Sequence, residues 1–257
     1  AKSIAIQPIP IEDRSRDSER TLRKRAATLC CMGQHEFLSS ELKAIPEWPV
    51  VYWWGKDFLK LYEEYPLLND CSPAIAFQSI SGNSRFLRHH FECSERFSKL
   101  PFGGAPSHSS WVPCINGADG LEWIEPLNHV IRWESYALEL RVRKQSLGQG
   151  NGTLANQNRF FTRGICFSMI GSDFSARVHR FPSYCGDKGN SLFPRVPAEL
   201  VCTLNASISR RILQDLNPSI SFQSGDVNRL PAFVISCAEE IFDRLEQEFV
   251  IHEAHRE

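Results

Sequence analysis

The spacing of apolar residues changes near Pro197, and this change divides the chain into two parts. Before Pro197, short apolar runs are separated by turn residues, a pattern that predicts strands. After Pro197, apolar residues recur at helical spacing, which predicts helices near 198–216 and 234–250. The pattern therefore predicts an α+β fold, with a strand-rich body between residues 74 and 180 followed by packed helices.

The clearest strand pattern runs from 158 to 178. Its apolar residues are Phe160, Phe161, Ile165, Phe167, Met169 and Ile170. Turn residues at 171–173 interrupt the run, so two strands joined by a turn are predicted. The basic residues of this stretch are Arg159, Arg163 and Arg177. They stand beside hydroxyl groups, and both kinds of group bind phosphate oxygens and base edges, although a hairpin with merely solvated arginines is the alternative.

Short patterns elsewhere predict further elements. Residues 1–16 are expected to form an extended leader without a stable element, followed by a basic helix from Asp17 to about Met32. The other predicted strands are VVYWWG at 50–55, AIAFQSI at 74–80, HVIRW at 129–133 and YALELRV at 136–142. A helix is predicted for DFLKLYEEYPLL at 57–68, and irregular structure for 99–120 and 144–157.

Hydrogen-bond donors gather directly after the predicted strand at 74–80. Donors that follow a strand-ending glycine suit phosphate binding better than a core position. We expect one concave surface to be lined by Asn83, Arg85, Arg88, Arg159, Arg163 and Arg177, and to be flanked by Trp111 and Asn116. The alternative is that some of these arginines pair with Glu92, Glu134 or Asp173 inside the domain, and Arg177 is the first candidate for such a pair.

Composition adds a division of charge to this picture. Although the net charge is −1, residues 76–196 carry 14 basic and 9 acidic side chains. Residues 233–257 carry 2 basic and 7 acidic side chains. A basic middle is a weak indication that this part faces a polyanion, and ordinary variation of surface charge is the alternative.

Membrane and metal functions are disfavoured. The sequence has no apolar run of about eighteen residues and no signal-peptide layout, so a soluble cytoplasmic protein without membrane contact is expected. Its nine cysteines form no CxxC pair, which predicts reduced thiols rather than a zinc or disulfide framework. His89, His90 and Cys93 lie close together, but no second pair has ligand spacing, so no metal site is predicted.

Motifs of autonomous catalysis are also missing. The chain contains neither GxSxG nor HExxH, and neither GxGxxG nor a Walker-type phosphate loop. No catalytic or cofactor-binding residue is therefore predicted, and an independent hydrolase or nuclease is the less favoured interpretation. A protein-interaction module is a further alternative, and it would require exposed tryptophans.

Six ordered blocks between residues 44 and 232 resemble a known family. The blocks are IPEWPVVYWW, SGNSRFLRHHFE, SSWVPCINGADGLEW, HVIRW, NRFFTRGICFSMIGSDFSARV and LNASISRRILQDLNPSISFQSGDVNRLP. In this order they resemble the C-terminal specificity region of the large adenine-specific DNA methyltransferases of phage-exclusion (BREX-type) systems. They are also similar to the related type IIG restriction-modification enzymes.

The resemblance implies a target-recognition domain at 46–232 that binds double-stranded DNA, with a C-terminal helix at 233–257. Residues 1–45 would then link it to a methyltransferase domain, which in the family binds S-adenosylmethionine and methylates adenine at N6. This chain has no NPPY-type tetrapeptide and no glycine-rich cofactor motif, so no catalysis is expected from it alone. A separate specificity subunit that partners a methyltransferase is the alternative.

Overall fold

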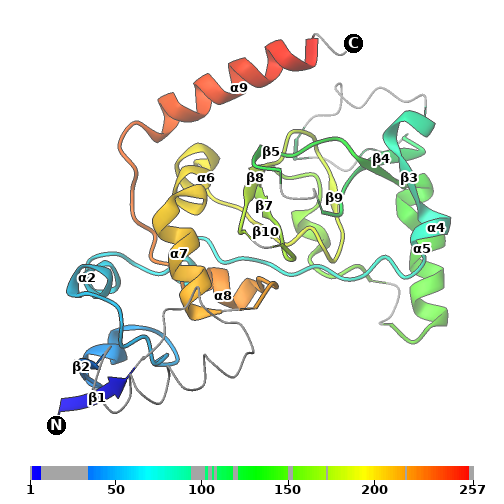
Figure 1. The fold of residues 1–257 in the computed structure, drawn as a ribbon. Coiled ribbons are helices and arrows are strands. Elements are labelled where there is room, and N and C mark those ends of the chain that lie inside the picture. Colours follow the sequence, from blue (N-terminus) through cyan, green and yellow to red (C-terminus); the bar gives the residue numbers. More distant parts are fainter. Residues whose placement is uncertain are drawn as a thin grey trace, which may run out of the picture. The chain divides into compact units, whose positions relative to one another are not determined.

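The computed structural model describes residues 2–6, 34–93, 102–103, 106, 109–117, 121–149, 153–171, 173–217 and 219–254. The helix predicted from Asp17 to Met32 lies outside these residues. Contacts within the chain define two compact units, Ala1–Tyr65 and Pro66–Glu257. Figure 1 shows the elements of both units in chain order.

The described residues of the first unit form a two-stranded antiparallel sheet and two helices. Its elements are β1 Lys2–Ile6, β2 Gln34–Leu38, the 3-10 helix η1 Glu41–Ala44 and α2 Lys56–Glu64. The prediction that residues 1–16 lack a stable element is wrong for β1, because its backbone partner β2 lies far along the chain. The helix predicted at 57–68 is confirmed as α2.

The aromatic run VVYWWG is not a strand, so this prediction is wrong. Trp54 is buried, and its ring centroid lies 5.4 Å from that of Phe58 and 6.0 Å from that of Tyr62, both on α2. Aromatic residues are common in strands, but here the aromatic run contains a residue that packs against a helix.

The second unit contains two four-stranded sheets, with strand orders β10-β7-β8-β5 and β3-β6-β4-β9. The strands are β3 Leu87–His89, β4 Trp111–Ile115, β5 Trp123–Ile124, β6 His129–Arg132, β7 Ile165–Phe167, β8 Ala176–Val178, β9 Tyr184–Cys185 and β10 Ser191–Leu192. The predicted α+β class is confirmed, since helices and mixed sheets share this unit. In Figure 1, α4, α5, β3 and β4 lie at one side of the unit and α6, α7 and α8 at the other.

The second unit contains the helices predicted after Pro197 and further helices between the strands and before them. They are α3 Leu68–Cys71, α4 Asn83–Phe86, the 3-10 helix η2 His90–Glu92, α5 Glu134–Ser146, the 3-10 helix η4 Gln157–Arg159, α6 Pro197–Asn205, α7 Ser207–Leu216, α8 Ser224–Asn228 and α9 Ala238–Ala254. The helix predicted near 198–216 is confirmed, but it breaks at Ala206, whose ψ of 142° is extended. The helix predicted near 234–250 begins later, at Ala238.

The hairpin predicted at 158–178 is confirmed as β7 and β8, which pair antiparallel with Cys166 opposite Arg177. The strand predicted at 129–133 is confirmed as β6. The strand predicted at 136–142 is wrong, because this segment belongs to α5. Leu138 and Val142 alternate with Leu140 as in a strand, yet both are 56% exposed while Leu140 is buried.

Two further predictions are wrong, one of irregular structure at 99–120 and one of a strand at 74–80. Residues 99–120 were expected to be irregular, but β4 lies inside this range between β6 and β9. Pro113 makes such a strand hard to recognise, since proline lacks the backbone donor. The parallel pairing with β9 starts at Cys114, one residue after the proline. Conversely, residues 74–80 form no strand and make only a single bridge, from Ile75 to Ser191.

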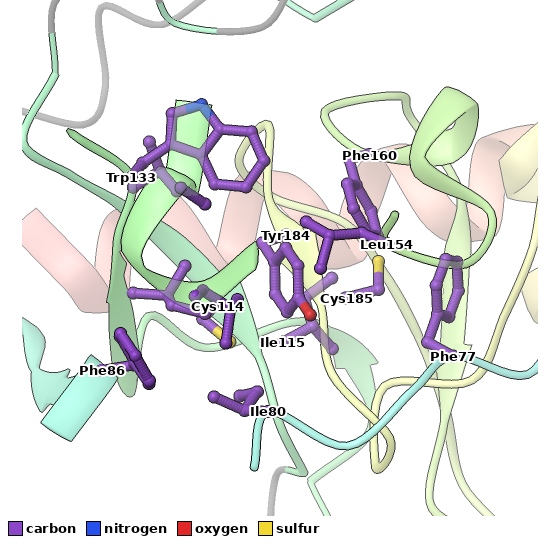
Figure 2. Close-up of a cluster of buried hydrophobic side chains, with 14 of the residues drawn as sticks. Phe77, Ile80, Phe86, Cys114, Ile115, Trp133, Leu154, Phe160, Tyr184 and Cys185 are labelled. Atoms are coloured by element: carbon purple, nitrogen blue, oxygen red, sulfur yellow. The ribbon is translucent and has the colours of Figure 1, made fainter. Parts of the chain in front are cut away.

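One buried aromatic cluster lies between the two sheets and supports the face described below. Figure 2 shows Tyr184 between Cys114 and Ile115 of β4 and the ring of Phe160. The ring centroids of Tyr184 and Phe160 are 4.5 Å apart, and Trp133 meets Phe161 edge to face at 4.9 Å. Because these side chains are buried, they hold β4 and β9 against the segment that leads into β7.

Candidate functional site

A glycine turn and a short helix position the first candidate residues. Gly82 has a φ of +139°, a conformation that favours glycine, and α4 starts directly after it. Phe86 at the end of α4 is fully buried, whereas Asn83 at its start is exposed. β3 follows at once, and its register with β6 places Arg88 opposite Val130. These donors therefore lie on regular elements held by the core.

Three contacts hold the half-buried guanidinium of Arg88. Its Nη1 donates to the carbonyl oxygens of Ser84 at 2.8 Å and Leu87 at 2.6 Å. Its central carbon lies 5.9 Å from the ring centroid of Trp111, within the range of a cation–π contact. Trp111 begins β4, so this contact bridges two strands that are separated by β6.

Arg88 lines a cleft of about 320 Å³ on this part of the sheet. The cleft is lined by Asn83, Leu87, Arg88, His89, Glu92, Asn116 and His129. Asn116 follows β4, and its Oδ1 is buried without a hydrogen-bond partner among the described residues. A Cβ at Gly186 would lie 2.9 Å from that oxygen, so glycine leaves the space for the amide. The structure thus brings Asn83, Arg88, Trp111 and Asn116 together.

Stacked rings form one edge of the cleft. The His89 ring is nearly parallel to the Phe91 ring, at 5° and 5.2 Å, and it also stacks on His129 at 5.1 Å. Phe91 is 75% exposed. The turn η2 begins with a capping box, in which the His89 side chain accepts from the backbone of Glu92 and Glu92 Oε2 accepts from His89 N–H at 2.7 Å. The exposed ring therefore stands on a braced turn.

Arg85 lies beside the cleft, but its charge is already paired. It forms an ion pair with Glu139, and its Nε donates to Glu139 Oε1 at 2.7 Å. Arg132 binds the other oxygen of Glu139 at 2.8 Å and Glu134 at 2.9 Å. All four side chains are at least one-third exposed, so this network is a surface feature.

Arg159 and Arg163 are exposed but do not line the cleft. Arg159 ends η4, and its guanidinium carbon lies 5.3 Å from the centroid of the Phe193 ring. Arg163 lies two residues before β7, in the other sheet. The side chains of Arg159 and Arg163 are therefore accessible to solvent or to a ligand outside the cleft.

Arg177 is a correction to the predicted surface, because its side chain has 0% exposure. Its Nε contacts Glu125 Oε2 at 2.5 Å, and its Nη1 donates to the hydroxyls of Ser168 at 2.9 Å and Ser175 at 3.2 Å. Burial raises the pKa of the neighbouring Cys166 thiol well above its ordinary value, so the thiol stays protonated and donates to Glu125. The alternative of an internal ion pair holds for Arg177, with Glu125 as its partner.

Sequence reasoning did not assign Glu92 or His129 to the site, and it weighed His89 as a metal ligand. The β3–β6 register brings His89 opposite His129, a pairing across forty residues that no local pattern reveals.

Within the described ranges, no group of three or more His, Cys, Asp or Glu side chains is arranged to hold a metal ion. The cysteines at 71, 93, 114, 166, 185, 202 and 237 are free thiols. Over the same described residues, no helix combines the length and apolar character needed to cross a bilayer.

The fold and the cleft define an α+β domain that presents an anchored arginine, two amides and stacked rings on one face. No protein-family model matches the chain. The chain is distantly similar to adenine-specific methyltransferase PglX of Lacticaseibacillus casei (strain Zhang), with 28% identity over 204 residues, which is 75% of this chain and 17% of that protein. It is also similar to adenine-specific methyltransferase BrxX of Escherichia coli O9:H4 (strain HS), with 24% identity over 202 residues, 76% of this chain and 16% of that protein. The chain thus spans about a sixth of the curated relatives it matches, and the predicted resemblance to adenine-specific methyltransferases is confirmed at this level.

Proposed function

We propose that this chain is the target-recognition part of an N6-adenine DNA methyltransferase of a phage-defence (BREX-type) or type IIG restriction-modification system. In this proposal it reads duplex DNA for a catalytic domain that is carried elsewhere in the same polypeptide or complex. The observation that carries the proposal is the cleft, which is lined by three of the eight residues expected to contact DNA, while a fourth, Trp111, packs on Arg88. The distant similarity to two adenine-specific methyltransferases supports the same conclusion.

The chemistry of the described surface fits a division of labour on DNA. Arg159 and Arg163 are exposed and suited to phosphate oxygens, which supply affinity without sequence information. The exposed amide of Asn83 offers donors and an acceptor, as base edges require, whereas the acceptor oxygen of Asn116 is buried. Arg177 has no part in this surface, since Glu125 and two serines already hold its side chain inside the domain.

The two glycines that follow β9 do not form a cradle for S-adenosylmethionine. Gly186 and Gly189, which follow β9, are closely packed rather than open to a cofactor. A Cβ at Gly189 would lie 2.5 Å from the carbonyl oxygen of Ile115, so this glycine serves the contact between β4 and the chain after β9. The methyl donor therefore belongs, in our proposal, to the separate catalytic domain.

Duplex binding tests the proposal directly. Fluorescence anisotropy of the chain with labelled random-sequence duplex should be measured between about 50 and 200 mM salt. The logarithm of the binding constant should fall linearly with the logarithm of the salt concentration. The double variant Arg159→Ala/Arg163→Ala should reduce the salt slope by about two. Arg85→Ala is the control, because Glu139 already pairs that guanidinium, and it should leave the slope nearly unchanged. Absence of binding at the lowest salt, or a slope near zero, contradicts the proposal.

A protein-interaction module is the second candidate, and α5 carries the observation that favours it. Tyr136, Leu138, Val142 and Leu147 are large apolar side chains of which about half the surface is exposed. Singly exposed apolar residues are ordinary, but Leu138 and Val142 lie one helical turn apart on α5 and are both exposed. If the chain fails to bind duplex and Leu138→Glu/Val142→Glu abolishes capture of a methyltransferase domain, this function replaces the first.

A further inference from the structure

Several arginines of the second unit are paired with carboxylates, and among the described residues Arg88 is not one of them. Arginines that form ion pairs with carboxylates are Arg85, Arg132, Arg177, Arg210 and Arg229. Arg88 is half-buried, yet within the described part of the chain no carboxylate lies within ion-pair distance of it. Glu92 lines the same cleft, but its Oε2 accepts from His89 N–H instead. The guanidinium of Arg88 therefore lies in the cleft without a direct ion pair to a described carboxylate.

The contacts of Arg88 leave one edge of the guanidinium available. Both hydrogen bonds to backbone carbonyls use Nη1, which has two protons to donate. Nε and Nη2 make no hydrogen bond to a described residue, so the three protons along this edge are available to a ligand. The Trp111 ring adds a third restraint, and an arginine restrained before binding loses less conformational entropy when it binds.

The available edge matches two coplanar acceptor atoms. On DNA, such a pair is offered by O6 and N7 of guanine in the major groove, or by two oxygens of one phosphate. The rest of the cleft favours the base, because the exposed amide of Asn83 carries an acceptor as well as donors. A phosphate has only acceptor atoms to offer, whereas base edges present both kinds of atom.

We infer that Arg88 is a specificity-determining residue that reads one guanine of the DNA target through its Nε–Nη2 edge. The inference rests on the proposed function, because it requires that this face meets duplex DNA. Arg159 is then the contrasting case, since its guanidinium also lies over a ring, Phe193, but no described hydrogen bond anchors it.

The test begins with selection of the bound sequence from a random duplex pool by the full chain. Affinities of the parent, Arg88→Lys, Arg88→Ala and Arg159→Ala are then measured on the selected duplex and on random duplex. Arg88→Lys keeps the charge but loses the fork, so it should bind the selected duplex about 5- to 150-fold more weakly and random duplex as the parent does. Arg159→Ala should weaken both duplexes alike.

Replacement of each guanine in turn by 7-deazaguanine removes one acceptor without changing base pairing. At one position this replacement should weaken the parent by a factor of about 5 or more, and should have little further effect on Arg88→Ala, as expected for two groups in contact. Circular dichroism and thermal melting check that each variant is folded. If Arg88→Ala does not fold, the comparison of parent and Arg88→Lys on the 7-deazaguanine duplexes decides the question.

Two results overturn the inference while the proposed function stands. If Arg88→Lys binds both duplexes as the parent does, or if 7-deazaguanine affects parent and variants equally at every position, Arg88 reads no guanine. If folded Arg88→Ala weakens selected and random duplex by the same factor, the edge binds phosphate instead. A parent that selects no sequence overturns sequence-specific recognition itself, which is a different failure from that of Arg88.

Discussion

Removal of the Glu125 carboxylate should destabilise the second unit strongly, although Glu125 lies outside the cleft. Arg177 is fully buried, and Glu125 provides its only carboxylate contact within the described residues, at 2.5 Å. Glu125→Ala would leave a guanidinium charge in the interior with only hydroxyl and carbonyl acceptors, those of Ser168, Ser175 and Leu121. Loss of one partner of a buried ion pair costs about 3–5 kcal/mol.

Urea unfolding followed by circular dichroism measures this cost, and thermal melting provides a second measure. For a unit of this size, the loss corresponds to a fall in Tm of about 6–20 °C. Glu139→Ala is the matched control, since it also removes a carboxylate from arginine partners, but these are exposed and such pairs contribute about 0–1 kcal/mol.

The double variant Glu125→Leu/Arg177→Met separates the two possible sources of the effect. If the cost comes from the orphaned charge, removal of both groups should recover most of the stability lost in Glu125→Ala, because apolar replacements of buried pairs are often tolerated. Glu125→Ala no more destabilising than Glu139→Ala would refute the reasoning. It would also reopen the possibility that Arg177 swings outward to a ligand.

Three further outcomes are expected. Burial lowers the pKa of His179 from 6.5 to about 4, so the unfolded chain takes up a proton at a higher pH than the folded chain. Stability is therefore full above pH 6.5 and falls by up to about 3 kcal/mol as the pH drops towards 4, and a urea series on parent and His179→Gln should show this slope only in the parent. Gly189→Ala should cost about 1–3 kcal/mol because its Cβ would meet Ile115 O at 2.5 Å, whereas Gly225→Ala, with open space around it, should be neutral or stabilising in the same assay. Calorimetry of the chain with S-adenosylmethionine should show no binding heat, and a methylation assay on adenine-containing duplex should show no transfer; a clear binding isotherm contradicts the assignment of the cofactor to a separate domain.

Local pattern predicted the elements whose apolar residues are spaced as the element requires. The hairpin of β7 and β8 and the helices α6, α7 and α9 belong to this group. Prediction was wrong where burial and spacing disagree. Leu138, Leu140 and Val142 alternate along α5, but only Leu140 is turned inward. The sequence shows where the apolar residues are, but the neighbouring elements determine which of them are buried.

The choice of candidate site residues shows the same limit. The sequence by itself determined that donors are dense after Gly82 and within 158–178, and that no catalytic motif accompanies them. It singled out Arg177 as the first candidate for an internal ion pair, but it kept Arg177 with Arg88 among the expected DNA contacts and did not identify Glu125 as its partner. The exposure of each guanidinium depends on partners far along the chain, which local composition does not contain.

Only the tertiary structure decided between these roles. Glu125 lies 52 residues before Arg177 and neutralises its charge inside the domain. Trp111 lies on β4 and covers Arg88 from across β6, without supplying a countercharge. An arginine becomes structural or ligand-facing according to whether the fold places a carboxylate beside it, because a buried charge is stable only when it is paired. That placement follows from strand order and register, which are properties of the whole chain.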